Sequence, residues 1–326
     1  MGCLLRFARC AGLPPRRCFD KIRCMKNVTV GLQIQRRDTL DGLLPVLTRL
    51  GVNRMLLHSS LAHPTLGQRR LAEIGTKLRD AGIEVETYFT GHVLGENSPD
   101  SLMRKIEAAK AVGARALCLN MPEDQDIERS RETDQRYNAE YRHLEEFVLS
   151  DWDKAKSELR AAGLGIRLRW VTGAYRRSDN ILRTLLAKGG KDVGLSWHTY
   201  GDASFVKYEL PPQLRVFGKR IQDFSMAFDH LGSWISHGYS FYGGYDHYTL
   251  DQKKDKYIEE FFDCWPPALD LLPSGVLGCV RFHVGDKEGE DEGFLVRQLD
   301  AMERALAESD KRKCASPKDG EGRDGK

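Results

Sequence analysis

Two histidines of this chain follow short, mainly apolar segments, at points where a buried strand would end. Val193–Trp197 runs into His198, and His283 stands near the end of the apolar segment Leu277–Val284. In parallel α/β folds the catalytic side chains come from the carboxyl ends of the strands, and imidazole moves protons or binds metals near neutral pH. The sequence therefore indicates His198 and His283 as catalytic residues. The competing interpretation is that both are hydrogen-bonded to neighbouring strands in a site that has lost its activity.

Other polar residues that follow predicted strands are expected at the same end of the sheet. Asp202 and Asp229 come after the sixth and seventh strands, where each is a candidate general base or metal ligand, or alternatively a helix cap or a solvated loop residue. Arg281 lies two residues before His283, on the same face of its strand, and a buried guanidinium there requires an anionic partner. The residues expected to contact a substrate are His58, His92, Asn120, Trp234, Tyr242 and Arg281.

A long connection, His230–Gln252, is rich in aromatic residues and glycine. Connections of this kind normally need about two to six residues, so its length asks for a reason. Trp234 and Tyr242 offer aromatic faces that suit a sugar ring, which favours a lid over the site. Exposed aromatic patches also mark subunit interfaces, so the loop equally predicts a contact between copies in a homo-oligomer.

These candidates sit in a regular alternation of strand and helix patterns. Leu40, Leu43 and Leu47 repeat at three- and four-residue spacing, which marks one helical face, and Gly51 closes that helix. Eight strand and helix pairs occupy about 280 residues, which matches an eight-fold barrel. The sequence predicts the α/β class and a single-domain (β/α)8 TIM barrel. The predicted strands are 28–33, 54–60, 85–89, 116–120, 165–171, 193–198, 220–228 and 277–284, and the later helices are 141–162, 181–186 and 256–271.

Composition divides the chain into three parts. Residues 1–24 hold Arg or Lys at six positions against Asp20 alone, which is typical of an organellar transit peptide. The alternative is an upstream extension or disordered leader before Met25. Residues 25–307 form the barrel domain, and residues 308–326 are too polar to pack and are predicted to be a disordered tail. The expected location is mitochondrial or in another organelle if the leader is a transit peptide, and cytoplasmic otherwise.

The composition also excludes several classes of function. The net charge is +3, of which residues 1–24 contribute +5, so the remainder is near −2 and lacks the basic surface of a nucleic-acid binder. No apolar run approaches the roughly 18 residues of a membrane span. The eight cysteines form no Cys-x-x-Cys pair, which argues against a zinc ribbon. Motifs for nucleotide binding, serine hydrolases and zinc proteases are absent from the sequence.

Four passages carry a resemblance to a known family. They are Leu71–Val85, Lys105–Leu117, Val193–Trp197 and Gly278–Val284. Together they resemble the xylose-isomerase-like TIM barrel superfamily of sugar phosphate isomerases and epimerases, over roughly residues 27–307. The resemblance implies the barrel fold and isomerase or epimerase chemistry on carbohydrates.

The same resemblance implies a divalent metal held by Glu, Asp, His and Glu at the ends of strands five to eight. The corresponding positions here are Val171, His198, Ser225 or Met226, and His283, and none carries the family's residue. The cofactor therefore remains open: a divalent metal in a rebuilt site, metal-free acid and base chemistry, or no chemistry at all.

The charges near the last two strands bear on the substrate. Residues 231–252 contain no Lys or Arg, and the 285–293 loop is acidic, which disfavours the phosphate site that such barrels often place there. We therefore expect a divergent sugar isomerase or epimerase that acts on a small neutral carbohydrate or polyol, with no nucleic acid or membrane partner. The alternative is a catalytically retired barrel that binds a small molecule or a protein.

Overall fold

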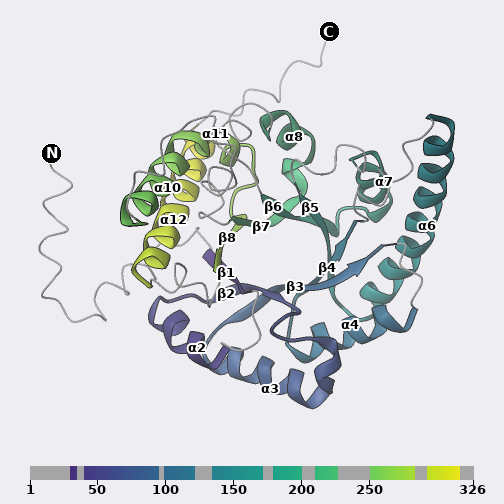
Figure 1. The fold of residues 1–326 in the computed structure, drawn as a ribbon, viewed down its shortest axis with the longest axis horizontal. Helices are drawn as coiled ribbons and strands as arrows, with labels where there is room; N and C mark the ends of the chain where they lie inside the picture. The colour runs from purple at the N-terminus through teal and green to yellow at the C-terminus, as the bar shows by residue number, and fades with distance from the viewer. Residues whose placement is uncertain are drawn as a thin grey trace, which may run out of the picture.

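The chain forms an eight-stranded parallel barrel surrounded by helices (Figure 1). The computed structural model describes residues 30–34, 40–94, 99–121, 134–171, 179–199, 210–226, 250–282 and 292–315. Each strand pairs in parallel with its sequence neighbour, and β1 pairs with β8 to close the ring. The strands are β1 (Val30–Ile34), β2 (Arg54–His58), β3 (Glu84–Val93), β4 (Ala116–Asn120), β5 (Gly165–Val171), β6 (Val193–Thr199), β7 (Ile221–Met226) and β8 (Leu277–Phe282).

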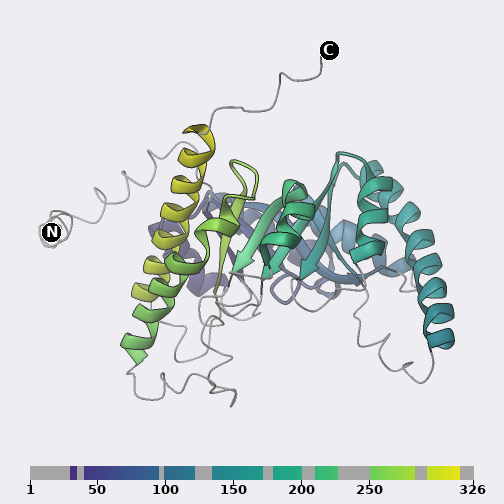
Figure 2. The same ribbon diagram turned by 90° about the horizontal axis from the view of Figure 1, so that it is seen from above.

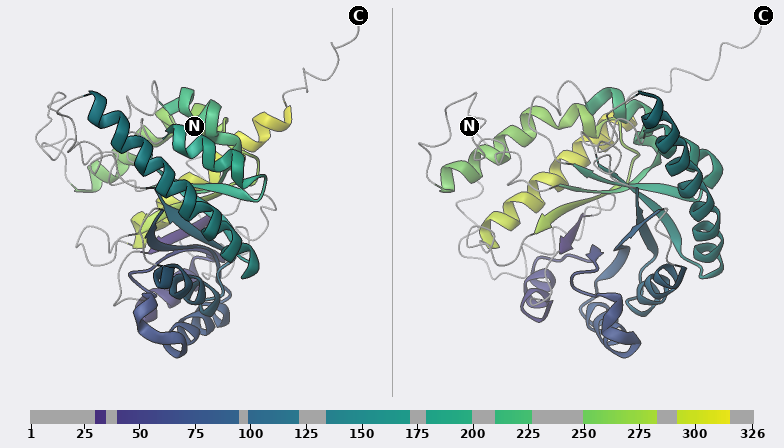
Figure 3. Two further views of the ribbon diagram at one scale, coloured as in Figure 1. Left: turned by 90° about the vertical axis from the view of Figure 1, so that its right-hand side faces the viewer. Right: turned by 45° about the vertical axis from the view of Figure 1, so that its right-hand side comes forward.

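Helices follow the strands and lie outside the ring. Figure 2 shows the long helices α6 and α12 on opposite sides of the barrel, and Figure 3 shows α6 running across its outer surface. The helices are α2 (Leu40–Arg49), α3 (Gly67–Asp80), α4 (Pro99–Ala111), α6 (Asp134–Ala161), α7 (Asp179–Gly189), α8 (Leu210–Phe217), α10 (Leu250–Cys264), α11 (Pro266–Leu269) and α12 (Glu292–Ala315), with short 3-10 turns η2 (Pro64–Leu66) and η4 (Gly218–Arg220). The predicted TIM barrel is confirmed, and no helix within the described ranges is long and apolar enough to cross a membrane.

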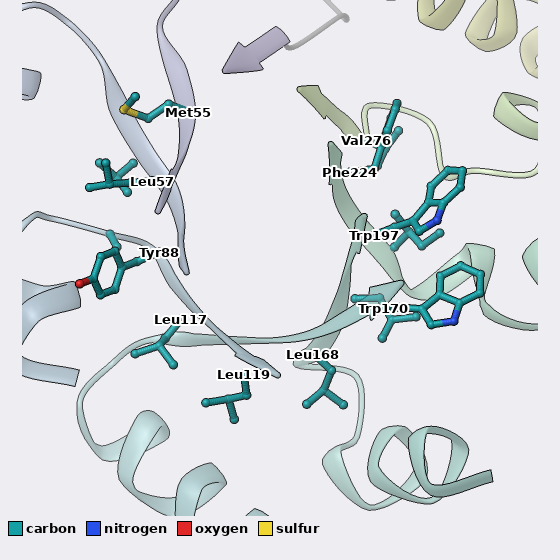
Figure 4. Packing of buried hydrophobic residues seen from close by; sticks show 14 of the residues in the cluster. Met55, Leu57, Tyr88, Leu117, Leu119, Leu168, Trp170, Trp197, Phe224 and Val276 are labelled. Carbon is teal, nitrogen blue, oxygen red and sulfur yellow. The ribbon is translucent and has the colours of Figure 1, made fainter. Parts of the chain in front are cut away.

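Most of the hydrophobic core lies between the strands and the helices. Successive residues of a strand point to opposite faces, so one set of side chains points to the helices and the other into the barrel. Leu117, Leu168 and Trp170 belong to the outer set (Figure 4). Trp197 is fully buried there, with its ring centroid 5.6 Å from those of Phe224 and Trp265. This aromatic packing fixes which residues of β5, β6 and β7 are left to face the interior.

Several predicted boundaries differ from the structure. α6 begins at Asp134, before the predicted start at residue 141, because Glu, Arg and Gln have good helix propensity. The predicted helix 256–271 is split into α10 and α11, since Pro266 cannot continue a helix interior. β7 begins at Ile221 after the η4 turn.

The end of the chain also differs from its prediction. Composition predicts a disordered tail after residue 307, whereas α12 continues to Ala315. Arg312 Nη2 lies 2.8 Å from Asp270 Oδ1, and the Ser309 side chain is fully buried. These contacts hold the last turns of α12 against the segment that follows α11, which compensates for their polar composition.

Candidate functional site

His198 lies inside the barrel near the carboxyl end of β6. Its side chain is 1% exposed, and its Nδ1 lies 3.1 Å from Ser225 Oγ on the neighbouring strand. On the far side, the ring of Phe89 meets the imidazole edge-on, with centroids 4.7 Å apart. A buried imidazole needs hydrogen-bond partners, and Ser225 supplies one of them at Nδ1.

A small apolar cluster lies next to His198 inside the barrel. Phe89 packs there with four other inward side chains that form a cluster separate from the outer core, namely Leu56, Cys118, Leu277 and Cys279. Burial raises the pKa of the Cys118 thiol, Asp223 adds to this, and Arg169 and Arg167 oppose it. Cys118 is thus a neutral thiol at physiological pH, which argues against a role as nucleophile.

A fully buried carboxylate, Asp223, lies one inward position below Ser225 on β7. Its Oδ2 accepts a hydrogen bond of 2.8 Å from Thr87 Oγ1 and lies 3.5 Å from Arg167 Nε, and its Oδ1 accepts from Ser196 Oγ. Burial raises the pKa of Asp223, while Arg167 and the hydroxyls of Ser196 and Thr87 oppose the shift and Glu86 adds to it. This carboxylate ties β3, β5, β6 and β7 together across the barrel.

The same charges continue to the amino ends of the strands. Arg167 Nη2 lies 3.9 Å from Glu86 Oε1, and Arg54 Nε donates to Glu86 Oε2 at 3.1 Å. Arg115 reaches Glu84 at 2.6 Å and Glu86 at 3.5 Å. We call these six residues the interior ion network: Arg54, Glu84, Glu86, Arg115, Arg167 and Asp223. The network runs from the fully buried Asp223 to Glu84 and Arg115, whose side chains are each 55% exposed, so paired charges extend from the interior to the amino ends of the strands.

The positions that the family would use for a metal are adjacent in this structure. Val171 is in register with His198, and His198 with Ser225, as the sequence comparison predicted. Met226 belongs to the outer core, so Ser225 is the residue of β7 that faces inward. A valine supplies no donor, and one imidazole with one hydroxyl does not match the oxygen-rich set that hard divalent cations prefer. Within the described residues, no three His, Cys, Asp or Glu side chains are grouped to hold a metal.

The remaining described candidates are dispersed. His58 ends β2. Its Nδ1 lies 3.0 Å from Ser60 Oγ and accepts a hydrogen bond of 3.1 Å from the Ser60 amide. Asn120 ends β4 half-buried, and its carbonyl accepts from Leu94 N at 2.9 Å. The assignment of both residues to the substrate site stays a prediction.

His92 takes a different position from the one expected. Its Nε2 lies 3.5 Å from Asp151 Oδ2 on α6, and its Nδ1 lies 3.4 Å from Lys105 Nζ on α4. The imidazole is 1% exposed. These contacts join two outer helices, and they favour a role in helix packing over the predicted role in substrate binding.

The other candidates lie outside the described residues. Among them are the second catalytic histidine, both loop aspartates and the aromatic loop: His283, Asp202, Asp229, Trp234 and Tyr242. Arg281 is placed only as a backbone position of β8, in register with Gln33 of β1. Their predicted roles stay hypotheses.

Sequence reasoning missed the polar groups that lie deepest in the barrel. Asp223, Arg167 and Arg169 are charged residues in the middle of otherwise apolar strands. A charge at such a position is costly unless it is paired, so its presence in a predicted barrel strand already signals an interior polar site. The sequence does not show which charged residues pair with one another, because the partners lie on strands far apart in the chain.

Comparison with known proteins identifies the fold. No family model and no curated protein matches the sequence. Among solved structures, 3-keto-D-glucoside 4-epimerase YcjR from E. coli matches with a TM-score of 0.52 and 15% identity, over 85% of this chain and 99% of that one. A xylose isomerase domain protein from Planctomyces limnophilus matches with a TM-score of 0.51 and 13% identity, over 87% and 99%. A fusion of a xylose isomerase-like TIM barrel with 4-hydroxyphenylpyruvate dioxygenase gives 0.53 and 14%, over 90% and 46%.

Proposed function

This chain has the fold of the xylose-isomerase-like TIM barrels, and on that premise we propose that it is an isomerase or epimerase of a small carbohydrate or polyol. The observation that supports the proposal most is the position of His198. Its imidazole is inside the barrel at the carboxyl end of β6, fixed by Ser225 at 3.1 Å and by Phe89 at 4.7 Å between ring centroids. In this fold the reacting groups are found at that end.

The proposed chemistry is proton transfer at a carbon next to a carbonyl group. His198 takes the proton as general base and returns it to the neighbouring carbon or to the opposite face. His283, Asp202 and Asp229 remain candidates for the second proton carrier. We take the substrate to be uncharged before reaction, in keeping with the acidic 285–293 loop.

Hydrogen exchange tests this function directly. The protein is incubated with a panel of ketoses and aldoses in deuterated water, with and without added Mg²⁺, Mn²⁺ or Zn²⁺, and deuterium at carbon is followed by NMR. We expect incorporation with at least one sugar, reduced about 10²- to 10⁴-fold in His198→Gln, because that is the usual contribution of a positioned general base. The matched control is His63→Gln, since His63 caps the η2 turn and is not one of the candidate site residues.

A retired barrel that only binds its ligand is the second candidate function, favoured by Val171 and Ser225 at two positions of the family's metal site. Exchange with no sugar under any metal condition, together with saturable binding of one of them, would support this candidate and contradict the enzyme proposal. Exchange that is unchanged in His198→Gln would exclude His198 as the base while leaving an enzyme built on other residues.

A further inference from the structure

We propose that Asp223 is a positioning residue for His198, because it holds together the three strands whose side chains meet at the imidazole. The inference rests on the proposed function, in which His198 transfers the proton. It gives the buried carboxylate a part in the reaction in addition to its place in the interior ion network. Asp223 itself does not contact the substrate and acts only through the position of His198.

The side chains around Asp223 and those around His198 form two layers inside the barrel. Asp223 accepts hydrogen bonds from Thr87 Oγ1 at 2.8 Å and from Ser196 Oγ. One layer higher, toward the carboxyl ends of the strands, His198 contacts a hydroxyl group and an aromatic ring. We call the two groups the carboxylate layer (Thr87, Ser196 and Asp223) and the imidazole layer (Phe89, His198 and Ser225).

The same three strands supply both layers. On each of β3, β6 and β7 the residue of the imidazole layer comes two positions after the residue of the carboxylate layer, and all six side chains are at most 3% exposed. Alternate residues of a strand share one face, and two positions span about 6.6 Å. Ser196 is in register with Asp223, and His198 with Ser225. Each strand that places a side chain at His198 is therefore held by Asp223 one step below.

A β-bulge lies directly below the two layers. The register of β6 and β7 shifts just before Ser196, so that Gln222 is an extra residue of β7. Its side chain lies over Gly194, where a Cβ would be only 2.6 Å from the Gln222 Cδ atom. Because the extra residue is absorbed at this point, the pairing below the bulge does not by itself determine the register above it.

The register without the bulge would remove Ser225 from His198. Pairing would slip by one residue, and Phe224 would then lie opposite the imidazole. A slip of one residue also exchanges the two faces of a strand, so Asp223 would turn toward the outer helices. Losing its hydrogen bonds among apolar side chains is costly for a carboxylate. The contacts of Asp223 therefore favour the register that places Ser225 beside His198, and the packing of Phe224 against Trp197 has the same effect.

Asp223 also fixes β3 relative to this pair of strands. Thr87 of β3 donates to the carboxylate, and Phe89 follows two residues later with its ring 4.7 Å from the imidazole between centroids. The bond to Thr87 therefore controls how the Phe89 ring approaches His198. Without Asp223, the three strands would lose their common contact in the layer below the imidazole. A shift of about 1 Å in a reacting group can lower a rate about 10²-fold.

Proton–carbon NMR of the histidine rings tests the positioning without any substrate. The His198 signals are identified by their absence from His198→Gln. We expect Asp223→Ala to shift them, because the side chains around the imidazole move. Asp223→Asn should leave them nearly unchanged, because an amide still forms both hydrogen bonds of the carboxylate layer. The control is Gly75→Ala, which disturbs the contact of α3 with the end of α4 and should leave the His198 signals in place.

Deuterium exchange into a sugar measures the effect on the reaction. In folded protein, Asp223→Ala should lower kcat about 10- to 10²-fold with little change in KM. Asp223→Asn should keep most of the activity, although the protein becomes less stable because Arg167 loses a charged partner. A residue that only stabilised the fold would lower the urea midpoint and leave the kcat of the folded protein unchanged.

Thr87→Val is measured in parallel, because it removes one hydrogen bond to Asp223 with little change in volume. It should shift the His198 signals more than Gly75→Ala does, so the test stands even if Asp223→Ala does not fold. The proposal is refuted if neither Asp223→Ala nor Thr87→Val shifts these signals beyond the control. It is also refuted if Asp223→Asn is altered as much as Asp223→Ala, because the charge of Asp223 and not its hydrogen bonds would then act on His198.

The two measurements separate this inference from the proposed function. His198 signals that depend on Asp223, in a protein that exchanges no sugar, would support the positioning while the isomerase proposal fails. Exchange that depends on His198, with the His198 signals and kcat unchanged in Asp223→Ala and Thr87→Val, would refute the positioning and leave the proposed function standing.

Discussion

Substituting Arg167 by methionine tests whether the interior ion network stabilises the barrel. Arg167 is 8% exposed and its Nε lies 3.5 Å from Oδ2 of the fully buried Asp223. At that separation an effective dielectric constant near 20 gives an attraction of about 5 kcal/mol. Removing one partner of a buried pair typically costs about 3–5 kcal/mol, because the other charge stays buried without compensation. We expect Arg167→Met to lower the free energy of unfolding by this amount.

The loss should depend on pH with a definite sign. Burial already raises the pKa of Asp223, and Arg167 is the strongest of the opposing influences, so its removal raises that pKa further. A carboxyl whose pKa is raised on folding contributes stability below its unfolded pKa, and that contribution is lost as pH rises through the folded pKa. Arg167→Met should therefore be more destabilising at pH 8 than at pH 5.

Urea unfolding followed by tryptophan fluorescence measures both effects. The control is Arg69→Met, whose exposed pair with Glu73 at 3.2 Å should contribute less than about 1 kcal/mol. In the double variant Arg167→Met with Asp223→Asn we expect part of the stability to return, since no charge is left without its partner. A loss below about 1 kcal/mol for Arg167→Met, or an equal loss at both pH values, would refute the reasoning.

Further predictions concern the packing around the barrel. A Cβ on Gly75 would lie 2.9 Å from Cα of Val112, where α3 approaches the end of α4, so Gly75→Ala should lower the free energy of unfolding. Gly42→Ala has open space and should raise the free energy of unfolding by up to about 1 kcal/mol. Trp197→Ala should cost about 3–5 kcal/mol and broaden the near-ultraviolet circular dichroism, because the fully buried indole joins the aromatic layer. Burial raises the pKa of Tyr88, so this tyrosine should not ionise while the protein is folded. In a spectrophotometric titration, Tyr88→Phe should therefore leave the number of ionising tyrosines unchanged in the folded protein and lower it by one in the unfolded protein.

The strand order that positions the candidate site was predicted correctly, whereas the roles of the site residues stay predictions. His198 was found from the sequence because a strand pattern ends beside it, and its register with Val171 and Ser225 follows the predicted barrel order. His92 shows the limit of that reasoning. It follows the pattern of β3, but the strand extends to Val93 and its imidazole contacts outer helices.

The sequence by itself determined the order of strands and helices. Hydrophobic periodicity and the placement of glycine are local properties, and here the same pattern is repeated over eight strand and helix units. Together with the resemblance to the xylose-isomerase-like barrels, it also predicted that the metal ligands of that family are replaced here, since that is a matter of residue type. Only the tertiary structure decided which charges meet. Asp223 is 136 residues from Thr87 along the chain, yet closure of the barrel brings them within 2.8 Å. Such contacts depend on register and on strand direction around the whole ring, and no local pattern encodes them.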